Sequence, residues 1–251
     1  TYLMLDETNL LTVFVAALIT ALATGLGALP LLFARRLDDR WLSVGAAIAA
    51  GLMLAASHSL VDEGAAIGGW RALAGIASGL VLVVLANRWI EARGSPDIGA
   101  LRGADARKAL LILGVMTAHS FAEGIGVGVS YGGGEDLGAF ITVAIAVHNI
   151  PEGLAISLVL VPRGVPIWKA AGWSIFTSLP QPLMAVPAWL LVTTFQPVLP
   201  IGLGIAAGAM IWMVFAELLP DAGKRLSPAA IASVILLSFM SMFAFQMVLH
   251  H

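Results

Sequence analysis

The chain has 251 residues, of which 59% are hydrophobic and 11% are charged, and its mean hydropathy is +0.95. Soluble domains carry roughly 25% charged residues, so this chain cannot cover a water-facing surface and is predicted to lie in a lipid bilayer. The absence of cysteine excludes disulfides, thiolate metal sites and cysteine nucleophiles, and the net charge of −2 argues against nucleic acid as a partner.

Apolar segments recur along the whole chain, each close to the roughly 20 residues that a membrane-spanning helix needs. We therefore expect an all-α polytopic membrane protein, a single domain over residues 1–251 with eight transmembrane helices. The expected helices cover residues 9–33, 42–61, 70–90, 109–130, 137–161, 168–194, 198–219 and 228–249. Their connections are short and polar and leave no room for a soluble domain.

Basic residues fall on alternate connections of this pattern, after the first, third, fifth and seventh helices, and Arg71 is the exception. Short loops rich in lysine and arginine remain on the cytoplasmic side of a membrane. The pattern therefore predicts a multi-pass protein of the plasma (inner) membrane with both termini outside the cytoplasm.

Two pairs of segments resemble each other although their helices are expected to run in opposite directions. The stretch His119-Ser-Phe-Ala-Glu123-Gly124 matches His148-Asn-Ile-Pro-Glu152-Gly153, and residues 49–53 match residues 206–210. Similar sequence in opposite orientation is typical of inverted repeats, which place a site near the membrane midplane. For the second pair, chance recurrence of alanine, glycine and methionine is an equally good explanation.

The two matched motifs contain most of the ionisable residues that lie inside the expected helices: His119, Glu123, His148 and Glu152. Residues four apart stack on one helix face, so each helix presents an imidazole and a carboxylate on one stripe. Facing stripes would bring four ligands together, which suits zinc and also ferrous iron or manganese. The alternative, two histidine–glutamate hydrogen bonds between helices, explains the repetition of the motif less well.

Other candidates are less specific. Ser120, Asn149 and Gln181 offer neutral oxygens to a second ion, and Met53 offers a thioether, although a methionine in an apolar helix usually packs in the core. His58 with Asp62 is either a metal entry point or a surface ion pair. Glu217 is either an exit ligand or a residue of a helix end.

At the two motifs the chain resembles the ZIP family of divalent metal transporters, in a prokaryotic type with short loops. The resemblance implies a binuclear midplane site, transport toward the cytoplasm, and zinc, iron, manganese or cadmium as cargo. It implies a first ion among Met53, His119, Glu123, His148 and Glu152. It implies a second ion near Ser120, Glu123, Asn149, Glu152 and Gln181. Ser120 stands where many members have asparagine, and Gln181 lies in a segment where some members have glutamate, which leaves the second position poorer in ligands.

We therefore expect a transporter, not an enzyme, that moves divalent transition-metal cations, zinc first among them, and needs no cofactor beyond the transported metal. A homodimer is one assembly that the sequence leaves open. The alternatives are an intramembrane metal-dependent hydrolase, in which the same ligands would activate water, and a metal-free proton pathway. The hydrolase is disfavoured because the chain has no His-Glu-x-x-His motif.

Overall fold

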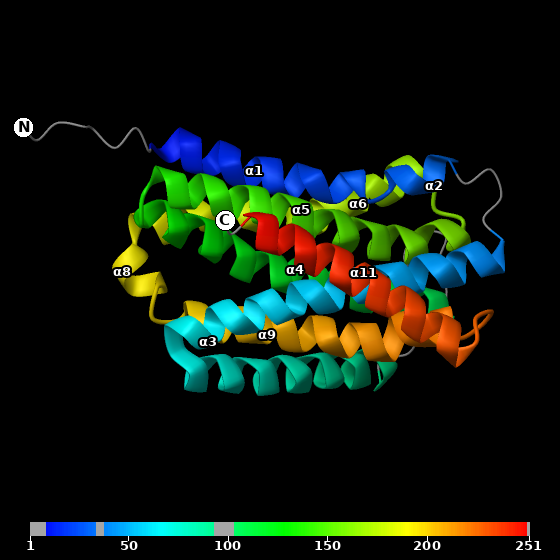
Figure 1. Ribbon diagram of the computed structural model, residues 1–251. Coiled ribbons are helices and arrows are strands. Elements are labelled where there is room, and N and C mark those ends of the chain that lie inside the picture. Colours follow the sequence, from blue (N-terminus) through cyan, green and yellow to red (C-terminus); the bar gives the residue numbers. More distant parts are fainter. Residues whose placement is uncertain (1–8, 34–37, 93–102, 250–251) are drawn as a thin grey trace, which may run out of the picture.

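The computed structural model describes residues 9–33, 38–92 and 103–249, and within these ranges all regular structure is helical. The helices lie side by side in one bundle (Figure 1). The basic loop residues Arg35, Arg36, Arg93 and Arg102 lie outside the described residues. In chain order the elements are α1 (Leu10–Leu26), α2 (Leu29–Phe33), α3 (Asp39–Ala92), α4 (Gly103–Gly132), α5 (Glu135–Leu160), the 3-10 turn η1 (Val161–Arg163), α6 (Ile167–Ser178), α7 (Pro180–Leu190), α8 (Val192–Phe195), α9 (Leu199–Met213), the π-helical segment η2 (Val214–Leu218), α10 (Leu219–Ala222) and α11 (Pro228–Leu249).

Six helical segments of the described chain are long and apolar enough to cross a membrane, which makes this a multi-pass membrane protein. They are Leu10–Phe33, Asp39–Trp89, Ala106–Gly132, Glu135–Arg163, Leu199–Ala222 and Pro228–Val248. Each coincides with one expected helix except Asp39–Trp89, which contains two.

The second and third expected helices are joined in α3, whose regular dihedral angles are interrupted at Gly68 (φ −172°, ψ 81°). Figure 1 shows α3 folded into two arms that run in opposite directions along the bundle, with α9 beside them. The long segment therefore passes through the bundle twice, as the sequence predicted for two helices.

The sixth expected helix, residues 168–194, is broken into α6 and α7, which meet at Leu179. Pro180 has no N–H to continue the hydrogen-bond ladder of α6, and neither piece alone is long enough to span a bilayer. The number of eight membrane passes and the inverted repeat both stay predictions.

The inside of the bundle is built mainly from α4, α5 and α9, whereas α11 lies at its periphery. Small side chains dominate this interior: Ala49, Ala50, Ala155, Ala206 and Ala207 are fully or almost fully buried. Because small residues let helix backbones approach closely, the polar motif residues of α4 and α5 come within reach of their neighbours.

Candidate metal site

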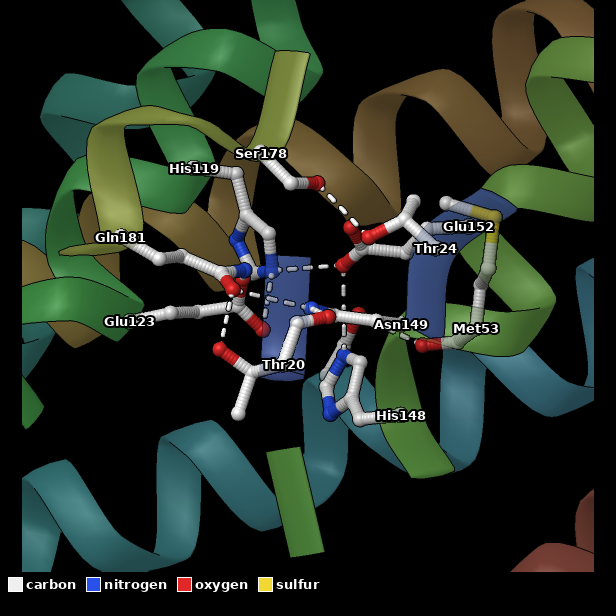
Figure 2. Close-up of polar contacts among 11 residues, drawn as sticks. Thr20, Thr24, Met53, His119, Glu123, His148, Asn149, Glu152, Ser178 and Gln181 are labelled. Atoms are coloured by element: carbon white, nitrogen blue, oxygen red, sulfur yellow. Dashed lines mark hydrogen bonds and ion pairs between the residues drawn. The ribbon is translucent and has the colours of Figure 1, made fainter. Parts of the chain in front are cut away.

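The two motifs face each other across α4 and α5. His119 and Glu123 of α4 and His148 and Glu152 of α5 each offer one ligand atom, and these four atoms lie within 4.8 Å of one another. Figure 2 shows the four side chains pointing into one space. All four are buried, with at most 6% of any residue exposed. The structure thus confirms that the two helical stripes converge.

The closest contact of the cluster crosses between the two helices, and two longer contacts lie within α4 and within α5. His119 Nε2 lies 2.7 Å from Glu152 Oε1 and 3.3 Å from Glu123 Oε1, and His148 Nε2 lies 3.5 Å from Glu152 Oε1. Apart from these contacts with one another, both Nε2 atoms, Glu123 Oε1 and both oxygens of Glu152 are buried without a hydrogen-bond partner. Buried polar atoms in native proteins are seldom left in this state.

A cation placed among these atoms satisfies them together. Two buried carboxylates carry negative charge that needs a positive partner in a low-dielectric interior, and a divalent ion supplies it. Zinc takes histidine nitrogen at about 2.0–2.1 Å and carboxylate oxygen at about 2.0–2.2 Å, usually with four ligands. The number and type of ligands therefore fit a divalent transition metal as substrate.

A glycine directly after each glutamate allows other helices to approach the cluster. A Cβ atom added to Gly153 would lie 1.7 Å from the Thr24 carbonyl oxygen of α1. A Cβ atom added to Gly124 would lie 2.5 Å from the Gln181 carbonyl oxygen of α7. The final glycine of both motifs is thus required by the close packing of α1 and α7 against the site.

The neutral neighbours on the α7 side form a hydrogen-bonded network (Figure 2). Gln181 Nε2 donates to Glu123 Oε2 at 2.6 Å, and Asn149 Nδ2 donates to the Thr20 carbonyl oxygen at 2.7 Å and to Gln181 Oε1 at 3.1 Å. The Thr20 hydroxyl lies 2.5 Å from Gln181 Oε1 and 2.7 Å from the Ala17 carbonyl oxygen. The polar side chains of this network, those of Thr20, Glu123, Asn149 and Gln181, are all buried.

Ser120 and Met53 are also fully buried near the middle of α4 and of the first arm of α3, and the Ser120 hydroxyl has no hydrogen-bond partner. Their binding roles stay predictions. Thr20, Thr24 and Ser178 were not identified from the sequence. The hydroxyls of Thr24 and Ser178 lie 2.8 Å apart and join α1 to α6.

Comparison with known proteins gives a match to the family model described as ZIP zinc transporter, over residues 92–247. This chain belongs to the ZIP family. It is 49% identical to a putative zinc transporter of Arabidopsis thaliana over 94% of this chain, and spans 39% of that relative's length. It is 32% identical to the zinc transporter GufA of Myxococcus xanthus (84% of this chain, 88% of the relative). It is 30% identical to the zinc transporter ZupT of Nitratidesulfovibrio vulgaris (87% and 90%).

Family membership makes this ZIP protein a transporter of divalent metals and not an enzyme, which confirms the main functional prediction. The hydrolase alternative has no support from these relatives, all of which are named as transporters.

His58 and Asp62 of the ZIP transporter lie outside the four-residue cluster but share a cavity with it. The cavity has a volume of about 600 Å³, and its lining includes His58, Asp62, Glu123 and His148. His58 is exposed, and its ring meets that of Phe243 edge-on at a centroid distance of 5.7 Å. The predicted entry residues are thus connected to the cluster by open space.

Glu217 lies at the other end of the bundle in η2, where it already has a cationic partner. Lys108 Nζ of α4 lies 2.9 Å from Glu217 Oε2 and 2.8 Å from Asp221 Oδ2. The sequence placed Lys108 in a loop, whereas α4 begins earlier than expected and includes it. In this conformation Glu217 is part of an ion-pair network between helices, and an exit role for it stays a prediction.

Proposed function

We propose that this ZIP transporter binds its cation among His119, Glu123, His148 and Glu152 and releases it toward the cytoplasm, with zinc as the preferred ion. The observation that carries the proposal is the set of buried nitrogen and carboxylate oxygen atoms that converge within 4.8 Å and have no hydrogen-bond partner outside the cluster, except Glu123 Oε2. A network kept for packing alone would also be tied to its surroundings by hydrogen bonds. A site that alternately holds and releases an ion leaves them available.

The cavities support entry from the end of the bundle where His58 and Asp62 lie. The cavity at that end is lined by Glu123 and His148. A second cavity, of about 510 Å³, opens at the opposite end, and none of the four cluster residues lines it. The conformation is therefore open to the site from one end of the molecule.

Charge supports the assignment of the opposite end to the cytoplasm. The second cavity is lined by Arg163, Lys224 and Arg225 together with Asp39 and Asp221. Clustered basic residues near helix ends favour the cytoplasmic side. The proposal thus places eight passes in a plasma (inner) membrane with both termini outside, counting α3 twice and α6 with α7 as one pass.

The ion pairs at this cytoplasmic end belong to the same proposal. Lys108 ties α4, which carries His119 and Glu123, to Glu217 and Asp221. Ser43 of α3 also donates to the Asp221 carbonyl oxygen at 2.9 Å. Release into the cytoplasm requires this end to open, so these contacts must rearrange during transport. Glu217 would then be free to receive the departing ion.

Zinc is proposed because the cluster combines two imidazoles with two carboxylates. Magnesium and calcium prefer sites made of oxygen alone, whereas zinc, iron and manganese accept such mixed sets. The relatives in Arabidopsis, Myxococcus and Nitratidesulfovibrio are named zinc transporters, which supports zinc within this group. A homodimer stays a prediction.

Uptake into proteoliposomes tests the proposal. We expect purified protein to admit zinc, and we expect excess zinc to suppress uptake of iron, manganese or cadmium more strongly than the reverse. Liposomes without protein are the control. Zinc uptake at the control rate would contradict the proposed function, and stronger competition by manganese or iron would contradict only the choice of zinc.

Acidification is expected to weaken metal binding. Imidazole must be neutral and carboxylate ionised to hold a metal, so protons compete with the ion at all four residues. Affinity should therefore fall as the pH is lowered from about 7.5 to about 5, which titration calorimetry on the purified protein measures. An affinity that does not change over this interval would exclude the His/Glu ligand set.

Filling the entry cavity is expected to slow uptake. Gly126 lines the cavity, and a Cβ atom added there meets nothing within 4 Å. A Gly126→Leu side chain would extend into this cavity near Glu123 and obstruct the ion. Gly114→Leu is the matched control, because Gly114 lies on the same helix, is exposed and also has free space around it. Equal uptake by the two variants would contradict this route.

A further inference from the structure

The hydrogen bonds around Gln181 fix the orientation of two amide groups. The Thr20 carbonyl oxygen can only accept, so the Asn149 atom 2.7 Å away must be the nitrogen. The same nitrogen lies 3.1 Å from one end of the Gln181 amide, which must therefore be the oxygen. The other end, the nitrogen, then faces Glu123 Oε2 at 2.6 Å. The main chain of α1 thus determines that Glu123 faces the nitrogen of the Gln181 amide and not its oxygen.

This arrangement turns the donor end of Gln181, and not its oxygen, toward the cluster. Its amide oxygen accepts from Asn149 Nδ2 and lies 2.5 Å from the Thr20 hydroxyl, whose single proton is shared with the Ala17 carbonyl oxygen. Its amide nitrogen is a donor only and is engaged with Glu123. Gln181 therefore acts on the cation through Glu123, as a positioning residue.

The same hydrogen bond divides the two oxygens of Glu123 between different roles. Oε2 is engaged by Gln181, whereas Oε1 is without a hydrogen-bond partner and lies 3.3 Å from His119 Nε2. A carboxylate that gives one oxygen to each of two ions needs both oxygens free. Because Oε2 accepts from the Gln181 amide, Oε1 is the Glu123 oxygen left without a hydrogen bond to face the other cluster residues.

We propose that the Thr20–Asn149–Gln181 network limits the site to one tightly bound cation by holding one oxygen of Glu123. This inference rests on the proposed function and specifies its stoichiometry. Charge leads to the same result, because Glu123 and Glu152 balance one divalent ion but not two. Ser120 Oγ and Asn149 Oδ1 are buried without hydrogen-bond partners, but neutral oxygens do not offset a second charge in a low-dielectric site.

The test counts tightly bound zinc per chain in purified protein, by mass spectrometry of the metal together with titration calorimetry. Ions are counted relative to the His148→Ala/Glu152→Ala variant, which removes half of the cluster. We expect one additional ion in the natural sequence and two in Gln181→Glu, which has the same shape, loses the amide donor and adds a negative charge. Two equally tight ions in the natural sequence, or no added ion in a folded Gln181→Glu, would overturn the inference.

Two threonines of α1 provide a second, independent comparison. Thr20 and Thr24 are both fully buried and one turn apart, but only Thr20 contacts Gln181. Loss of a residue that contacts and orients a ligand costs about 10–100-fold in metal affinity. Thr20→Val removes only the hydroxyl contact to Gln181 and keeps the Thr20 carbonyl, so we expect a loss near the lower end, about tenfold. Thr20→Ser should restore affinity, and Thr24→Val should leave it unchanged. Equal effects of the two valine variants would contradict the positioning role even if Gln181→Glu failed to fold.

The two proposals fail in different ways. If the His148→Ala/Glu152→Ala variant holds as much zinc as the natural sequence, the cluster is not the metal site and the proposed function fails together with this inference. If that variant loses its zinc but the natural sequence holds two equally tight ions, only the limit to one ion is wrong.

Discussion

The His148→Ala/Glu152→Ala variant is expected to take up metal at the background rate while still reaching the membrane. The substitutions remove one imidazole and one carboxylate from a cluster that is at most 6% exposed. Loss of a residue that only orients a ligand already costs about 10–100-fold in metal affinity, so removal of two of the four ligands should lower binding by more than about a hundredfold. Membrane insertion should not suffer, because alanine is easier to place in a bilayer than a charged side chain.

The measurement is radioactive zinc uptake, normalised to the amount of protein in the membrane. Ser157→Ala is the matched control, because Ser157 is a fully buried polar residue of the same helix that is not part of the cluster. His119→Ala/Glu123→Ala should behave like the first double variant. Normal uptake by either double variant would show that the ion follows another path.

Gly153→Ala is expected to destabilise the folded protein and to reduce transport. The added Cβ atom would lie 1.7 Å from the Thr24 carbonyl oxygen, far inside van der Waals contact, so α1 would have to move away from α5. Overpacking of this kind costs about 1–3 kcal/mol and sometimes more. The displacement would also move Thr20, which holds Asn149 and Gln181 in place.

Thermal unfolding of the purified protein in detergent measures the stability change. Gly172→Ala is the control, because Gly172 lies within α6, is exposed, and an added Cβ atom there meets nothing within 4 Å. There the substitution should be neutral or stabilising by up to about 1 kcal/mol, because alanine favours helices over glycine. A Gly153→Ala protein that melts at or above the temperature of Gly172→Ala would contradict the packing account.

The sequence predicted the ligand cluster because helical geometry fixes it locally. A histidine and a glutamate four residues apart must share a face, and the repetition of this pattern in adjacent antiparallel helices indicated that the faces meet. The apolar lengths likewise predicted the helices. The two arms of α3 are separate helices that meet at the non-helical Gly68, as the sequence predicted for the second and third helices. One boundary differed, because α4 starts before Lys108.

The partners of the cluster were not predictable in the same way. Thr20 and Thr24 are single polar residues in an apolar helix and have no ionisable neighbour in α1 to distinguish them from residues that bond to their own helix. The sequence left Glu217 as either an exit ligand or a residue of a helix end, and its ion pair with Lys108 was not predictable because Lys108 is distant in sequence. Such contacts depend on how distant helices pack.

The position of the bound ion tests the central claim most directly. Crystals of the zinc-loaded protein, measured at the zinc absorption edge, give an anomalous peak wherever zinc binds. The account predicts a strong peak within about 2.0–2.2 Å of the ligand atoms of His119, Glu123, His148 and Glu152. A strong peak elsewhere in the protein with none among these four side chains would contradict it.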